Sequence, residues 1–343
     1  MKKLLNTLYV SSPESYLSLD GENVVLKQND EIVGRVPLHN IDRIVSFGYR
    51  GVSPALMGKC VKDQIELVFL NMSGKFLARV EGSISGNVLL RKRQFEISEN
   101  ESQSIDIVKN MIAGKIYNSR QVLLRTVRDH SQRIDAEQIK KKAEYLQTSL
   151  DKCRSVDTID SLRGIEGEAA SIYFSVFDQM ILQQKGTFIF EVRSKRPPMD
   201  KVNALLSFSY SLCTSMCGSA LESVGLDPYV GYLHTDRPGR RSLALDLVEE
   251  FRAWMCDRFV LSLINKKLVT EDDFIQKEDG AVFLTDEGRT KFLTAWQNRK
   301  NETITHPFLE EKIEWGMLPY VQALLLARYM RGDLDGYPVF LWK

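Results

Sequence analysis

The stretch YLSLDGENVVLKQNDEIVGRVPL, residues 16–38, sets the architecture of the N-terminal part of the chain. Apolar and polar residues alternate along it, and an Asp-Gly pair and an Asn-Asp pair interrupt the alternation. A period of two is typical of half-buried strands, and such residue pairs are typical of the tight turns between them. We therefore predict three strands joined by two turns.

The remainder of residues 1–100 continues this pattern of strands and turns. Residues 65–70, IELVFL, form an apolar run of strand length, and the turn sequence NMSG at 71–74 leads into KFLARVEG. One short helix is expected at 53–63, because Ser53 can cap it and Pro54 fits its first turn. We predict a small β-rich domain over residues 1–100.

The hydrophobic period lengthens to that of a helix after the polar, acidic stretch at 97–103. Ser104 can cap a helix whose apolar stripe comprises Ile105, Val108, Met111, Ile112, Ile116, Val122 and Leu123. Further helices are expected at 139–150, 158–183, 200–224 (ended by Gly225), 242–259, from Thr285 onward and at 318–330, with a hairpin at 274–285. The prediction is an α+β multidomain protein with an all-α C-terminal domain over residues 101–343.

Composition argues against several classes of protein. The net charge is only +1, so any nucleic-acid binding must come from local basic patches. The five cysteines are irregularly spaced and include no CxxC pair, which argues against a zinc ribbon and for a reducing compartment. The phosphate-binding loop GxxxxGK[ST], a GxGxxG after a strand and the serine-hydrolase motif GxSxG are absent.

The sequence contains no signal for secretion or for a membrane span. Asn6 and Thr7 interrupt the apolar run near the start, and no small-residue cleavage site follows. No stretch approaches the about 18 apolar residues that a membrane span needs. We therefore expect a cytoplasmic protein that binds no membrane.

The stretch GYLHTDRPGRRSLALDLVEEFR, residues 231–252, concentrates the residues with chemical potential. In the expected helix, capped by Ser242, the carboxylates of Asp246 and Glu249 lie one turn apart and repel each other unless a cation lies between them. The pattern alone fits either a solvated charged face or a cation site. His234 adds an imidazole nitrogen, and nitrogen with carboxylate oxygen suits Mn²⁺, Zn²⁺ or Fe²⁺ and tolerates Mg²⁺.

The best candidate for a third ligand is Glu166, in LRGIEGEAASIYF at 162–174. Gly164 and Gly167 flank it, and each glycine costs a helix about 1 kcal/mol relative to alanine. This cost suggests close approach of another backbone or a ligand, although tight helix packing with an exposed Glu166 fits equally. Glu168 is expected to face away from Glu166.

Several motifs, in this order along the chain, resemble the Cas-one family of CRISPR-associated integrase–endonucleases. They are GSISGNVLLRKRQF (82–95), GKIYNSR (114–120), LRGIEGEAASIYF, RPPMDKVNALLSFSYSL (196–212) and the stretch at 231–252. The likeness continues to the closing RGDLDGYPVFLW and so covers essentially the whole chain.

The resemblance implies an N-terminal β-sandwich-like domain that dimerises and a C-terminal α-helical catalytic domain. It also implies one divalent metal, Mg²⁺ or Mn²⁺, held at Glu166, His234 and Glu249. The family often has Asp where this chain has Glu249, and Asp246 matches a neighbouring acidic position that is either a ligand through water or a support for the ligands. The implied partners are double-stranded DNA, a second copy of the chain, a small Cas-two-type protein and in some systems a Cas-four-type nuclease.

The implied reaction is metal-assisted phosphoryl transfer, which joins the 3′-hydroxyl of a short DNA fragment to a CRISPR repeat or, with water, cleaves DNA. We expect DNA phosphates to contact the basic residues Arg91, Lys92, Arg93, Lys195, Arg196, Arg237, Arg240, Arg241, Arg252 and Arg258. Two alternatives remain: a DNA-binding subunit with a degenerate site, and a stand-alone metal-dependent DNase unrelated to CRISPR.

Overall fold

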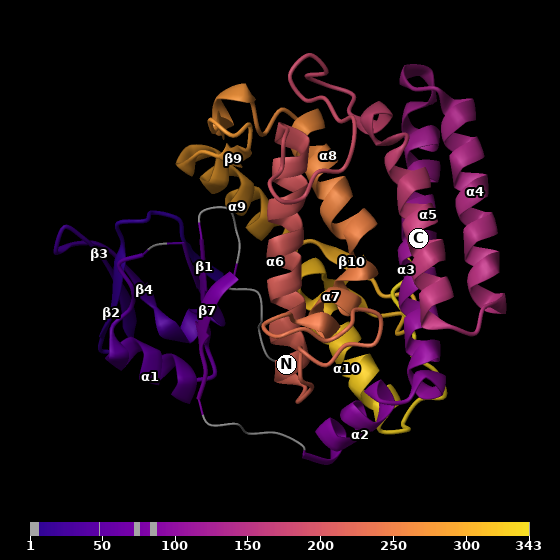
Figure 1. Cartoon of the computed structure of the whole chain (residues 1–343). Coiled ribbons are helices and arrows are strands. Elements are labelled where there is room, and N and C mark those ends of the chain that lie inside the picture. Colours follow the sequence, from indigo (N-terminus) through magenta and orange to yellow (C-terminus); the bar gives the residue numbers. More distant parts are fainter. Residues whose placement is uncertain (1–6, 48, 72–75, 83–87, 343) are drawn as a thin grey trace.

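The computed structural model describes residues 7–47, 49–71, 76–82 and 88–342. Figure 1 shows a strand-rich N-terminal part beside a larger helical part, with α6 near the junction. The predicted α+β class is thus confirmed, with strands first and helices after. The expected turn at 71–74 lies mostly outside the described residues, as do residues 83–87 of the motif at 82–95.

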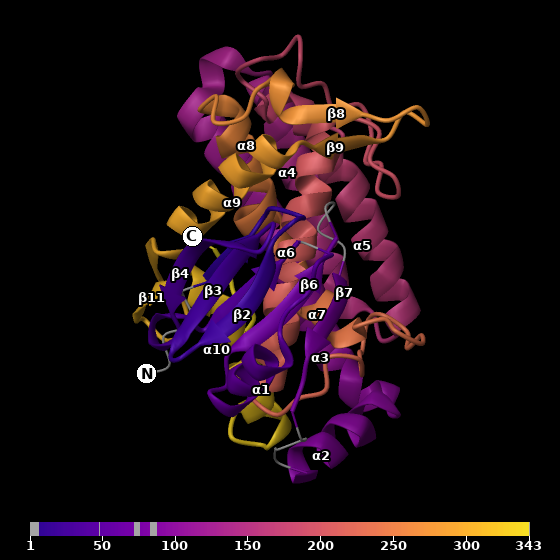
Figure 2. The same ribbon diagram turned by 90° about the vertical axis from the view of Figure 1, so that its left-hand side faces the viewer.

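The N-terminal part contains two sheets, both visible in Figure 2. One has the order β1 (Thr7–Val10), β5 (Arg43–Ser46), β6 (Glu66–Leu70) and β7 (Phe76–Val80), in which β1–β5 and β5–β6 pair in parallel and β6–β7 antiparallel. The other is an antiparallel meander of β2 (Tyr16–Asp20), β3 (Asn23–Gln28) and β4 (Glu31–Pro37). Leu17, Val24, Ile44 and Leu67 belong to one buried apolar cluster drawn from both sheets, so the sandwich-like arrangement is confirmed.

Short-range signals in this part place the turns and the helix as expected. The two turns lie at the expected Asp-Gly and Asn-Asp pairs, where Gly21, Asn29 and Asp30 all have the positive φ that is common in tight turns. Helix α1 (Pro54–Lys62) is capped by Ser53, whose hydroxyl accepts from the Leu56 N–H at 3.2 Å.

The helical part begins earlier than expected. Its helices are α2 (Val88–Ser98), α3 (Glu101–His130), α4 (Ala136–Ser155), α5 (Ile159–Phe174), α6 (Lys201–Ser223), α7 (Ser242–Glu249), α8 (Arg258–Asn265), α9 (Asp286–Lys300) and α10 (Leu318–Met330). Two small hairpins, β8 (Phe274–Gln276) with β9 (Val282–Leu284) and β10 (Thr303–Thr305) with β11 (Lys312–Glu314), lie between them.

One helix was not expected, and two expected helix boundaries differ from the structure. Helix α2 lies within the expected β-rich region, because Leu90, Gln94 and Ile97 form a buried helical stripe there. Asn100, not Ser104, caps α3, and its side chain accepts from the Ser102 N–H at 3.0 Å. The expected helix at 158–183 ends at Phe174 in α5. The exact division into domains at residue 100 stays a prediction.

The expected helix at 242–259 is broken into three pieces. α7 ends at Glu249, a π-helical segment covers Arg252–Asp257, and α8 follows. Ser242 is the first helical residue and not the cap. A π turn contains an additional residue, so it rotates everything after Glu249 relative to an α-helix, and such turns are frequent at functional sites.

Helix α6 is the apolar centre of the helical part. By length and composition it could cross a membrane, contrary to our expectation that no stretch approaches this, but 78% of the relevant window is buried inside the protein. The burial is that of a core helix. Arg43 of β5 connects α6 to the sheets, because its guanidinium pairs with Glu66 at 2.9 Å and donates to the Ser215 hydroxyl at 2.5 Å.

Candidate active site

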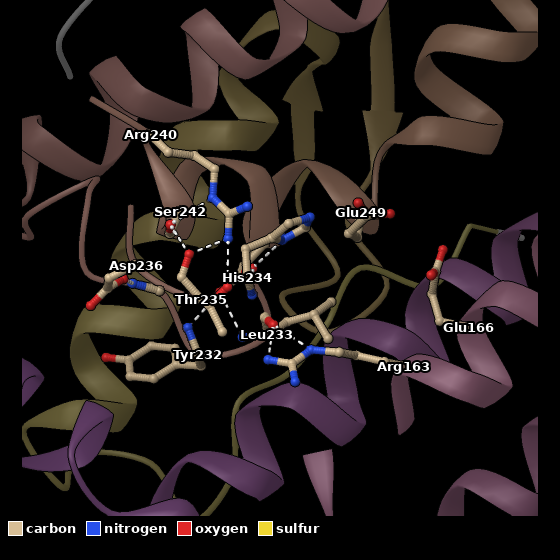
Figure 3. A network of polar contacts seen from close by, with 12 residues as sticks. Arg163, Glu166, Tyr232, Leu233, His234, Thr235, Asp236, Arg240, Ser242 and Glu249 are labelled. Atoms are coloured by element: carbon tan, nitrogen blue, oxygen red, sulfur yellow. Dashed lines mark hydrogen bonds and ion pairs between the residues drawn. The ribbon is translucent and has the colours of Figure 1, made fainter. Parts of the chain in front are cut away.

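The three predicted ligands line one cavity of about 500 Å³. Glu166 comes from α5, His234 from the loop before α7 and Glu249 from the last turn of α7. Figure 3 shows these three side chains on neighbouring elements of the same region. The cavity is also lined by the cations Lys115, Arg193, Lys195 and Arg252. A cavity lined by several cations together with carboxylates and an imidazole suits a phosphate-bearing ligand.

Glu166 lies on a partly exposed face of α5, whose first turn is capped by Thr158. The inference of close backbone approach at Gly164 and Gly167 was wrong, since a Cβ at either position would meet nothing within 4 Å. Glu168 faces elsewhere, as expected, and pairs with Lys152 at 3.5 Å. Gly164 and Gly167 are therefore exposed positions of α5, where no helix packs closely.

Asp246 fixes the loop that carries His234. Its completely buried carboxylate accepts the backbone N–H groups of Tyr232 (2.6 Å), Leu233 (3.0 Å) and His234 (2.9 Å). It also lies 2.6 Å from His234 Nδ1. An ionised carboxylate can only accept, so Nδ1 carries a proton, and in the neutral ring the lone pair is then on Nε2. Asp246 therefore contacts both the backbone and the ring of His234 and positions the imidazole.

Two further interactions hold this loop, as Figure 3 shows. Arg163 of α5 donates to the Leu233 carbonyl from Nε at 3.0 Å and from Nη2 at 2.7 Å. Arg240 donates from Nη2 to the Thr235 carbonyl. Gly231 has to be glycine, because a Cβ there would lie 2.6 Å from the Ser242 Cβ. The loop is thus tied to α5 through Arg163, and it is tied to α7 through Asp246 and through the Ser242 hydroxyl, which donates to the Thr235 carbonyl at 3.2 Å.

Glu249 is buried, and cations hold it. Its side chain is 4% exposed, and its two oxygens contact Arg252 Nη2 at 2.9 Å and Lys115 Nζ at 2.6 Å. Burial alone would raise the pKa of Glu249, but Arg252 and Lys115 outweigh it and hold that pKa well below the usual range. The solvated charged face considered for Asp246 and Glu249 was therefore wrong.

Lys115 lies in the site, but reasoning from single positions did not select it. Its ammonium pairs with both Glu166 and Glu249, so it joins two of the three predicted ligands. It lies within GKIYNSR, a motif that carried the family resemblance, and immediately before Ile116 of the apolar stripe of α3. Because the motif was used only as a whole, the lysine itself received no role.

Part of the cavity wall is a buried polar cluster around Asp257. The Tyr210 hydroxyl donates to Asp257 Oδ1 at 2.5 Å, and the guanidinium groups of Arg193 and Arg252 lie over the Tyr210 ring at 5.3 and 4.8 Å. Burial raises the pKa of Asp257 to about 7 despite the Tyr210 hydrogen bond and the nearby arginines. This cluster supports Arg252 from behind.

The predicted DNA-contacting residues fall into different environments. Lys195 lines the cavity and Arg196 follows it, and both are exposed. Exposed or partly exposed positions also include Arg91, Lys92, Arg93, Arg237, Arg240 and Arg258. Arg252 is inside the site, paired with Glu249. Arg241 was wrongly placed among them, because it is 8% exposed and its guanidinium lies 3.9 Å from the Phe76 ring centroid of β7.

The donor types present fit a hard divalent cation. Carboxylate oxygens and an imidazole nitrogen are ligands for Mg²⁺ or Mn²⁺, and Lys115 shows that a cation is accommodated between Glu166 and Glu249. Within the described residues, however, no three His, Cys, Asp or Glu side chains are already grouped closely enough to hold a metal. The geometry is therefore that of two carboxylates occupied by an internal ammonium.

Comparison with known proteins shows extensive similarity. Residues 8–298 match the family described as CRISPR associated protein Cas1. The chain is 52% identical to the CRISPR-associated endonuclease Cas1 2 of Rhodospirillum rubrum and 47% identical to the CRISPR-associated endonuclease Cas1 1 of Chlorobaculum tepidum, each with 100% of both chains covered. It is 33% identical to a Cas4/Cas1 fusion of Geobacter sulfurreducens, over 98% of this chain and 60% of the fusion.

Two solved structures share the fold. A casposase bound to integration product aligns with a TM-score of 0.84 at 23% identity, over 98% of this chain and 94% of that chain. A chain of a Cas6-RT-Cas1–Cas2 complex aligns with a TM-score of 0.82 at 22% identity, over 100% of this chain and 36% of that chain. The family match over residues 8–298 and the relatives at 47–52% identity over their whole length show that this chain belongs to the Cas1 family of CRISPR-associated proteins.

Proposed function

We propose that the protein is the integrase–endonuclease of CRISPR adaptation. In this reaction the 3′-hydroxyl oxygen of a short DNA fragment bonds to a phosphorus at the border of a CRISPR repeat. The bond between that phosphorus and the 3′-oxygen of the flanking strand breaks, and the flanking strand leaves as a 3′-hydroxyl after taking up a proton in place of the one that the attacking hydroxyl loses. Water in place of the attacking hydroxyl gives cleavage instead. The observation that carries the proposal is the convergence of Glu166, His234 and Glu249 on one cation-lined cavity in a Cas1-family chain.

Glu166, His234 through Nε2, and Glu249 are the residues that would hold Mg²⁺ or Mn²⁺. A divalent ion at this point supplies stabilisation of negative charge on the phosphate oxygens and favours deprotonation of the attacking hydroxyl. The choice between the two metals is left open by these ligands, because both accept oxygen and imidazole donors.

The protein's own residues provide orientation and charge around that point. Asp246 holds the imidazole with its Nε2 lone pair available. Arg252 stays beside Glu249, fixed by the Tyr210 ring, and keeps that carboxylate charged. Lys195, exposed at the cavity, and Arg196, exposed next to it in the chain, are placed to bind the phosphates of the DNA backbone.

The proposed partners are double-stranded DNA, a second copy of the chain and a small Cas-two-type protein. A relative fused to a Cas4 exonuclease supports a Cas-four-type nuclease as a further partner, and the Cas6-RT-Cas1–Cas2 complex supports the small one. The N-terminal sheets support self-association, because their edges expose backbone groups that can pair with another chain. A cytoplasmic location accords with this substrate.

The alternatives are less well supported. A degenerate DNA-binding subunit would be expected to lack a ligand residue, whereas Glu166, His234 and Glu249 are all present and line one cavity. A stand-alone DNase unrelated to CRISPR is disfavoured by relatives that are named CRISPR-associated over their full length.

Integration of a short duplex into a repeat-bearing plasmid, with the small partner and Mn²⁺, tests the proposal. Glu166→Gln, His234→Ala and Glu249→Gln should each remove integration and cleavage while the circular dichroism spectrum stays that of the wild type. The matched control is Glu168→Gln, because Glu168 lies on the same helix but pairs with Lys152 outside the cavity. Wild-type turnover by the His234→Ala protein would show that the ligand assignment is incorrect.

A further inference from the structure

We propose that Lys115 is the resident counter-ion of the active site and that it exchanges with the divalent metal. In the metal-free protein its ammonium holds Glu166 and Glu249 together, and metal binding requires that it leave. The inference rests on the proposed function to the extent that the metal binds at these two carboxylates.

The ammonium of Lys115 is inside the site. Its side chain is 13% exposed and pairs with Glu166 and, at 2.6 Å, with Glu249. The two carboxylates come from α5 and α7, so a cation between them offsets a repulsion that acts between two different helices. A metal ion bound by the same oxygens would have to occupy the space that the ammonium now fills.

The backbone of Lys115 is held in register with Glu249, so this placement is built into the fold. Three residues further along α3, the Asn118 side-chain amide donates to the Glu250 and Phe340 carbonyls at 2.8 Å each. One residue before Lys115, Gly114 packs so closely that a Cβ on it would lie 2.3 Å from Val339 Cγ2. The helix is therefore anchored on both sides of Lys115, and only the flexible stem of the side chain is free to move.

Charge balance indicates which cation leaves. Without metal, the two carboxylates are balanced by Lys115 and Arg252. Arg252 is fixed over the Tyr210 ring at 4.8 Å, whereas a lysine is a point charge on a flexible chain of methylene groups. A divalent ion would therefore displace the ammonium of Lys115, while Arg252 would stay beside Glu249. The site then carries excess positive charge, which favours an anionic phosphodiester.

If Lys115 competes with the metal, its removal should tighten metal binding. The test is titration of the metal-free full-length protein with Mn²⁺, following the electron paramagnetic resonance signal of free Mn²⁺. Lys115→Met, which keeps the length and removes the charge, should bind Mn²⁺ about tenfold more tightly, equivalent to about 1.4 kcal/mol. Lys115→Arg should bind it more weakly than the wild type, because a guanidinium can pair with carboxylates in a bidentate manner.

The control is Lys109→Met, because Lys109 lies on the same helix and pairs at 3.2 Å with Asp157, outside the cavity. Its Mn²⁺ affinity should equal that of the wild type. Unchanged or weaker Mn²⁺ binding by Lys115→Met would overturn the exchange, as would shifts of the same sign in the Met and Arg variants. If the wild type binds no more Mn²⁺ than Glu249→Gln does, the proposed metal site itself fails, and this outcome is distinct from failure of the role of Lys115.

Discussion

Substitution of Asp246 by asparagine tests how the structure prepares His234 to bind a metal. Asp246 is fully buried, and one of its oxygens accepts from Tyr232 and Leu233 while the other faces the His234 N–H and Nδ1. Asparagine has nearly the same shape but only one acceptor oxygen. The NH2 group of the asparagine must therefore point at one of these two pairs of donors.

Either orientation of the amide has a cost that the structure defines. If the NH2 group faces Tyr232 and Leu233, its hydrogens lie against the buried backbone N–H groups of these two residues. Turned toward His234, it forces the imidazole to put its proton on Nε2, which removes the lone pair needed by the metal. At least one buried donor is left unpaired, so we expect a decrease of about 1–3 kcal/mol in unfolding free energy. Removing a hydrogen-bond partner of a metal ligand typically lowers metal affinity by about 10–100-fold.

The assay combines Mn²⁺ titration, thermal unfolding and integration rate for the Asp246→Asn protein. Asp236→Asn is the matched control, because Asp236 is in the same loop but exposed and accepts only from the Gly231 N–H at 3.3 Å. Its Mn²⁺ affinity should stay at the wild-type value. If Asp246→Asn unfolds more easily yet binds Mn²⁺ as tightly as the wild type, Asp246 has a structural role only, and the argument from the tautomer is refuted.

Three other outcomes are expected. Replacing Lys195 and Arg196 together by alanine should weaken the binding of duplex DNA. The slope of log affinity against log salt concentration should become shallower by about 0.9 for each phosphate that the protein no longer neutralises. The control, Lys140→Ala on α4, should leave that slope unchanged. For Asp257 the folded protein retains a proton up to about pH 7, well above the unfolded value, so stability should fall as pH rises from 4 to 7 by up to about 1.4 kcal/mol per unit. Asp257→Asn should remove this part of the pH dependence, and parallel stability curves for the two proteins would contradict it. Sedimentation should show a dimer at micromolar concentration, as a two-fold assembly requires. Glu166, His234 and Glu249 line a cavity within one chain, so mixing the Glu166→Ala protein with the His234→Ala protein should restore no activity.

Local signals were sufficient to predict much of the fold. The turns at Gly21 and at Asn29–Asp30 require positive φ, and few residue types adopt it readily, so the three strands could be located from the sequence. Ser53 and Thr285 likewise cap helices where expected. By contrast, the parallel pairing of β1 with β5 joins distant segments, and the hydrophobic period does not specify which strands pair.

The site was only partly predictable from the pattern of residues. Family resemblance selected Glu166, His234 and Glu249, but the pattern of the helix also fitted a solvated charged face. Burial of Glu249 depends on Lys115, which comes from α3, and on Arg252, which the π segment places nearby. In the sequence, Arg241 cannot be distinguished from the other arginines near the Pro-Gly turn. In the structure, Phe76 from a strand of the N-terminal sheet covers its guanidinium.

The residue missed from the sequence explains why the predicted ligands can come together without a metal. Two carboxylates at the end of one helix and the middle of another would repel across a cavity, and the buried one would lose its charge if nothing balanced it. Lys115 provides that balance, and Asn118, through Glu250 and the chain's closing segment at Phe340, keeps it in register with Glu249. If a divalent ion binds these carboxylates as proposed, a cation that is tethered and can be displaced suits the site. The ammonium keeps the carboxylates charged and close while it stays, and its departure leaves them ready for the metal.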